Sequence, residues 1–96
     1  MENKDAFEKK HEAKIEEMKA EIDRLKAKAK QSEAESEIKY KEKISELESL
    51  KDDAETKLEE VKKSSKDAWS DVSKGLESAT ESLSTALKSA SQQFKK

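Results

Sequence analysis

The sequence has no cysteine, no proline, one glycine and no long apolar run. Without cysteine there are no disulfides and no thiolate metal sites. The lack of proline and the single glycine remove the residues that most often interrupt helices. No segment approaches the ~20 apolar residues that span a bilayer, and the first residues show no secretory signal. We therefore expect a cytoplasmic protein.

The residues that are present favour long helices. Ala, Glu, Lys, Leu and Arg supply 56 of 96 positions, a composition typical of coiled coils. Leu, Ile, Val and Phe supply only 15, which is below the ~20% at which a globular core becomes doubtful. The composition therefore predicts an all-α protein and argues strongly against a compact globule made by one chain. The net charge of −2, with both signs interspersed, argues against a nucleic-acid partner.

Charge divides the chain into two parts that no glycine or proline linker separates. Residues 1–63 hold 16 basic and 19 acidic side chains, whereas residues 64–96 hold five and four, with nine serines and two threonines. Small or apolar residues recur every three or four positions in both parts. They form a heptad pattern in the first part and an 11-residue (hendecad) repeat in the second. Val61, Val72 and Leu83 lie 11 apart, and the phase does not change at Ser64-Ser65.

The unbroken phase predicts one long, nearly straight amphipathic helix, roughly 140 Å long at ~1.5 Å per residue. The alternative is a helical hairpin with a break near Ser64-Ser65. Between Ser32 and Ser36 the apolar stripe passes through Ser and Glu, so we expect a thinned core, an offset or a bend there.

A straight helix cannot cover its own apolar stripe, so we expect self-association of two to four or more chains into a coiled-coil bundle or filament. The expected interface consists of Ile15, Met18, Ile22, Leu25, Ala29, Tyr40, Ile44, Leu47, Ala54, Leu58, Val61, Ala68, Val72, Leu76, Ala79, Leu83, Leu87, Ala90 and Phe94.

Few residues suggest chemistry. An enzyme needs convergent polar groups in a pocket, and the chain has no Gly-rich phosphate loop and one histidine. We expect no catalytic, cofactor or metal site and no small-molecule substrate.

His11 follows Phe7 in the apolar stripe. Several copies of His11 meeting in an oligomer would offer a metal or pH-sensing site, but a partly exposed edge residue is the simpler interpretation. Gly75 would permit either close packing or a bend.

Residues 66–94 combine an apolar face with a polar face made mostly of Ser and Thr. Helices of this kind insert between lipid headgroups. Eleven-residue repeats also occur in apolipoproteins, lipid-droplet coat proteins and late-embryogenesis proteins. Trp69 either widens the contact face or, with Phe94, anchors a partner or lipid. The leading hypothesis is thus a non-enzymatic structural protein. The alternatives are a lipid-binding, membrane-peripheral protein and a stress-protective helical protein.

Two stretches together carry a family resemblance. Residues 12–29 read EAKIEEMKAEIDRLKAKA, and the later segment contains Asp67-Ala68-Trp69 followed by Gly75-Leu76-Glu77-Ser78-Ala79. A charged helix followed by such a small-residue tail resembles a group of short prokaryotic coiled-coil proteins with no assigned activity. The resemblance implies a coiled-coil fold and a prokaryotic origin.

Overall fold

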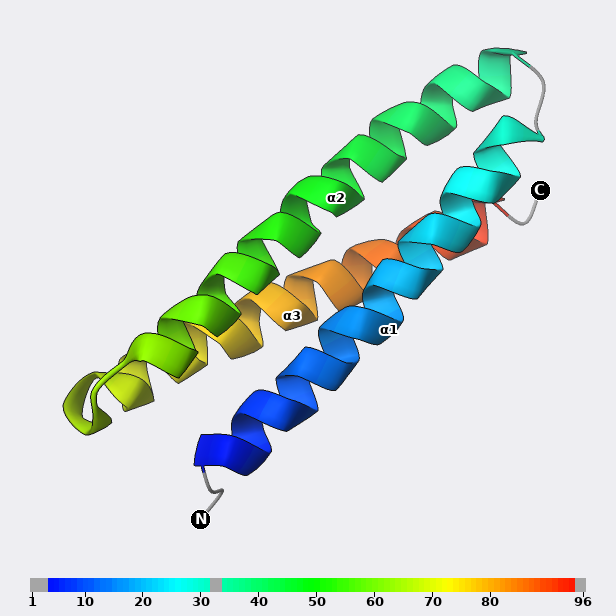
Figure 1. The fold of residues 1–96 in the computed structure, drawn as a ribbon. Coiled ribbons are helices and arrows are strands. Elements are labelled where there is room, and N and C mark those ends of the chain that lie inside the picture. The colour runs from blue at the N-terminus through cyan, green and yellow to red at the C-terminus, as the bar shows by residue number, and fades with distance from the viewer. Residues whose placement is uncertain (1–3, 32–33, 95–96) are drawn as a thin grey trace.

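The described residues form three helices that pack side by side. The computed structural model describes residues 4–31 and 34–94, without the side chains of residues 34–36 and 94. Its helices are α1 (Lys4–Lys30), α2 (Ala34–Lys63) and α3 (Lys66–Phe94). Figure 1 shows α1 and α3 running in one direction and α2 in the other. The all-α fold predicted from the sequence is confirmed.

The predicted single straight helix is wrong. The molecule measures 51 × 17 × 16 Å, because the chain reverses between Lys30 and Ala34 and again at Ser64-Ser65. The second reversal is the one named in the hairpin alternative. The first falls within the expected weak point, although Ser32 and Glu33 lie outside the described residues. One chain thus makes the compact core that the composition argued against.

An unbroken hydrophobic phase does not prevent a chain reversal. Each helix of a hairpin turns its own apolar stripe toward the same core, whichever way it runs. Phase therefore identifies the buried face of each helix but carries no information on where the chain turns.

The turn between α2 and α3 is made by two serines. Ser64 donates from its backbone N–H and from Oγ to Val61 O, at 3.2 and 2.8 Å. Ser65 caps α3, because its Oγ accepts from Ala68 N at 3.3 Å and its carbonyl accepts from Trp69 N at 2.9 Å. These bonds satisfy helix-end groups that would otherwise lack partners. No described residue has a positive φ, so the turn does not need a left-handed glycine.

The core is built from two clusters along the bundle. At the end where α1 finishes, the buried side chains are Ile22, Leu25, Ala29, Ile44, Leu47, Leu83, Leu87 and Ala90. At the other end they are Phe7, Ile15, Ala54, Leu58, Val61, Leu76 and Ala79. Met18 packs against both clusters. Alanine at several of these positions lets helices approach closely, so few large side chains complete the core.

Leu47 provides a direct test of this intramolecular core. It is 1% exposed, whereas Ile38, on the same helix, is 62% exposed. We expect Leu47→Ala to lower the free energy of unfolding by about 2–5 kcal/mol, measured by urea denaturation followed by circular dichroism. The loss should not depend on protein concentration, because the lost contacts lie within one chain.

Ile38→Ala is the matched control, and it should change the free energy by less than about 0.5 kcal/mol. Equal losses for the two variants, or a loss for Leu47→Ala that fades at high concentration, would contradict the single-chain core.

Candidate functional site

Most residues expected between chains are buried inside this one. The buried members are Ile15, Ile22, Leu25, Ala29, Ile44, Leu47, Ala54, Leu58, Val61, Leu76, Ala79, Leu83, Leu87 and Ala90. Met18, Tyr40 and Val72 are half-buried, Ala68 is exposed, and the Phe94 side chain lies outside the described residues. The periodicity thus found the buried face, and the surface that covers it is the chain's own other helices.

Ion pairs between charged side chains join helices α1 and α2. The ion pairs that link them include Lys62–Glu12 at 3.2 Å, Lys19–Glu55 at 3.4 Å, and Lys26–Glu48. The hydrogen bond to the Glu12 carboxylate raises the pKa of Lys62 above its usual value. Each such surface pair is weak, but all three act between the same two helices.

Helix α3 is held differently. Within the described chain, none of the seven charged side chains of Lys66–Phe94 forms an ion pair. Its buried hydroxyls bond to their own helix: Ser73 Oγ donates to Ser70 O at 3.0 Å, and Thr80 Oγ1 lies 3.1 Å from Leu76 O. Packing of apolar and small residues therefore attaches α3. If α3 separated from the bundle, the Ser73 and Thr80 hydroxyls would keep their hydrogen bonds.

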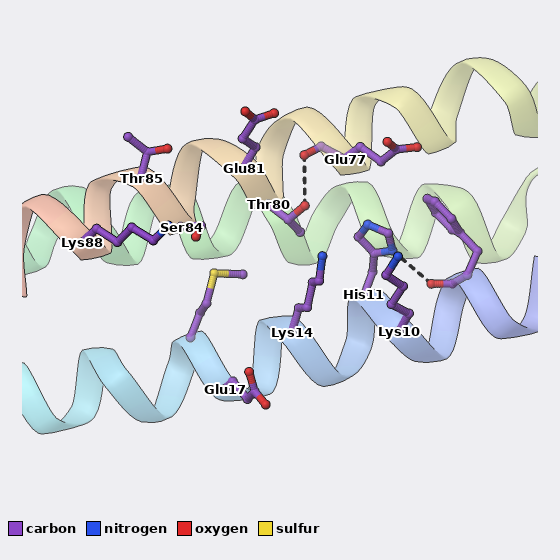
Figure 2. A pocket seen from close by; sticks show the side chains of 12 residues that line it. Lys10, His11, Lys14, Glu17, Glu77, Thr80, Glu81, Ser84, Thr85 and Lys88 are labelled. Atoms are coloured by element: carbon purple, nitrogen blue, oxygen red, sulfur yellow. Dashed lines mark hydrogen bonds between the residues drawn. The ribbon is translucent and has the colours of Figure 1, made fainter.

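A shallow groove runs between α1 and α3, which we call the α1–α3 groove. Its walls include Lys10, Lys14, Glu17, Thr80, Ser84 and Lys88. Figure 2 shows Lys14 rising from α1 toward α3, and Thr80 pointing from α3 toward α1. Three lysines and three glutamates line it, namely Lys10, Lys14, Lys88, Glu17, Glu77 and Glu81. The groove therefore has no strong field of one sign to concentrate an ion.

His11 lies in the wall of this groove and is buried, at 4% exposed, so the expectation of a partly exposed edge residue is wrong. Its ring packs against Phe7 with centroids 4.2 Å apart, and its Nδ1 lies 3.0 Å from Phe7 O. With Nδ1 donating to that carbonyl, the ring is fixed along its own helix. No group of three or more His, Asp or Glu residues in the described part of the chain is placed to hold a metal.

Trp69 is the least satisfied side chain of α3. Its ring meets Phe7 edge-on, with centroids 5.1 Å apart and planes at 72°. Its Nε1 is buried, and no described atom accepts a hydrogen bond from it. Buried indole N–H groups usually have a partner, and a missing one costs about 1–3 kcal/mol. The contact between α3 and the start of α1 therefore contains a polar group that would gain from exposure.

Gly75 has no packing reason to be glycine. A Cβ placed there would meet only Lys57 Cδ, at 3.8 Å, which is an ordinary contact. The helix continues through this position, so neither close approach nor a break accounts for the residue. Its effect is to weaken α3 by about 1 kcal/mol relative to alanine.

Comparison with protein-family models, curated proteins and solved structures finds no match for this chain. The resemblance to short prokaryotic coiled-coil proteins therefore stays a prediction. Among the described residues, no helix has the length and apolar character needed to cross a membrane.

The open space at Gly75 gives a second prediction. Gly75→Ala should raise the free energy of unfolding by up to about 1 kcal/mol, because alanine loses less backbone entropy in a helix. Urea denaturation measures the change, and Ala13→Gly on the exposed face of α1 should move it by a similar amount in the opposite direction. A lower stability for Gly75→Ala would mean that α3 needs glycine for its packing.

Proposed function

We propose that the protein is a non-enzymatic binding protein whose third helix leaves the bundle to lie on a lipid surface. The observation that supports this most is the unequal attachment of the helices. Ion pairs join α1 to α2, whereas among the described residues no charged side chain of α3 forms an ion pair, and α3 packs mainly through apolar and small residues. A helix held in this way is the one that separates first.

A lipid surface would replace the contacts that α3 makes in the bundle. The face that α3 turns to the core carries Trp69, Val72, Leu76, Leu83 and Leu87. Removing such side chains from water is worth about 25 cal/mol per Å² in either setting. Leaving the bundle also uncovers part of α1 and α2, which keeps the bundle closed until lipid is present. Lipid then shifts the population toward the open form.

The polar face of α3 selects the kind of surface. Three lysines and four acidic residues within Lys66–Phe94 leave a net charge of −1, so anionic headgroups would not attract it. Small Ser and Thr side chains cover most of the rest. Binding should therefore depend on the apolar face entering gaps between lipids, as at curved membranes. At the headgroup level the Trp69 N–H would also regain a hydrogen-bond partner.

The test uses two leucines of the same core cluster, Leu25 on α1 and Leu87 on α3, which are 4% and 5% exposed. Either change to alanine leaves a cavity of comparable size and so lowers the stability of the bundle by a similar amount. Only Leu87→Ala also removes an apolar side chain from the face that would meet lipid. Binding to small phosphatidylcholine vesicles is followed by flotation and by the emission of Trp69, the single tryptophan.

We expect Leu25→Ala to bind at lower lipid concentration than the unmodified chain, because its bundle opens more easily. Leu87→Ala should need at least about fivefold more lipid than Leu25→Ala, since each buried CH₂ lost removes about 0.8 kcal/mol. Equal binding of the two variants, or no flotation of any of the three proteins, would overturn the proposal.

A further inference from the structure

We infer that two copies of this chain exchange α3 by straightening at Ser64-Ser65. In the exchanged dimer α2 and α3 form one continuous helix, and each α3 completes the bundle of the partner copy. The inference shares with the proposed function only the premise that α3 separates, and it does not require lipid.

The buried faces of α2 and α3 keep the same hydrophobic phase across the turn. Ala54, Leu76 and Leu87 are spaced by multiples of 11 residues, and all three are buried. Eleven residues correspond to three helical turns. A straight α2–α3 helix would therefore carry the core residues of both halves on one side. A second chain could cover that side with the contacts that the bundle already uses.

The turn at Ser64-Ser65 has a sequence that can also be helical. It contains no glycine or proline, and no described residue has a positive φ. Straightening would let the N–H groups of residues 65–68 bond to the carbonyls of residues 61–64 in the ordinary helical way. It would remove the bonds of Ser64 and Ser65 that end the helices, and the bond from Lys4 Nζ to Ser64 O at 3.2 Å. The few hydrogen bonds that hold the turn are therefore replaced by helical backbone hydrogen bonds when the chain straightens.

The surface beside the turn exposes small residues that continue the buried rows. Ala68 belongs to the same 11-residue row as Ala79 and Ala90, which are buried, yet Ala68 is exposed in the single chain. Ser65, in the row of Ala54 and Leu76, is also exposed. In the exchanged dimer two straight helices would cross in antiparallel fashion at this point. Two small residues there let the helices approach closely, and the row of small residues would be covered along its length.

The variant Lys66→Pro distinguishes the single-chain bundle from the exchanged dimer. Lys66 is the first residue of α3, where proline is well tolerated because its N–H has no helical partner. In a continuous helix the same proline would break a hydrogen bond and clash with the preceding turn. We expect Lys66→Pro to keep the bundle and to stay at the 10.9 kDa chain mass in sedimentation at every concentration, including after refolding at high concentration.

The double variant Ser64→Ala/Ser65→Ala should act in the opposite direction. It removes both serine caps and favours helix through the turn. After refolding, we expect it to reach twice the chain mass at a concentration at least tenfold lower than the unmodified chain. Lys66→Ala is the matched control and should dimerise at least as readily as the unmodified chain. A double variant that stays monomeric, or a Lys66→Pro chain that dimerises equally, would overturn the inference.

Distance measurement identifies the exchange itself. Lys43 and Ser89 line the same groove between α2 and α3, and the chain has no native cysteine. Spin labels on Lys43→Cys and Ser89→Cys, diluted with unlabelled chain before refolding, should be close in the monomer and about 70 Å apart within one chain of the dimer, at ~1.5 Å per residue. A dimer that keeps the short distance would overturn the inference. Lys66→Pro should still bind vesicles, so failure of the exchange and failure of lipid binding remain distinguishable.

Discussion

Every feature of this fold depends on covering an apolar stripe that has few large side chains. Each of the three helices turns one narrow apolar face toward the common core. Alanines between the leucines and isoleucines let the helices come close, so modest apolar area gives a continuous core. The remainder of each helix can then be charged or small without loss of the fold.

The helices contribute unequally to that core. Ion pairs add a polar attachment between α1 and α2, whereas α3 depends on its apolar face. The buried N–H of Trp69 has no hydrogen-bond acceptor among the described atoms. A lipid surface and a second copy of the chain would both cover the apolar face of α3. The two proposed states therefore exclude each other for any one α3, and lipid would be expected to draw chains out of an exchanged dimer.

The helical period of the sequence identifies the buried face of each helix but not the direction in which the chain runs. Leu47, Val61 and Leu83 were expected in the contact and are fully buried. The rod was wrong because an unbroken phase fits a hairpin as well as a straight helix. Ser64-Ser65 gave a weak signal, since serine favours helix caps, but nothing in its spacing distinguished a cap from a mediocre helical position. His11 was placed in the stripe, but its burial needed a neighbouring helix.

The sequence by itself determined that the chain is helical, which face of each helix is apolar, and that the last third has few charges. These are local properties, set by residue type and spacing along one helix. The tertiary structure alone decided what covers the stripe, where the chain turns, and that ion pairs join α1 to α2 but, in the part of the chain that the structure describes, none holds α3. Those depend on contacts between residues distant in the sequence, 60 or more positions apart in the bond from Lys4 to Ser64 and the ring contact of Phe7 with Trp69, and helical periodicity carries no information about such distances.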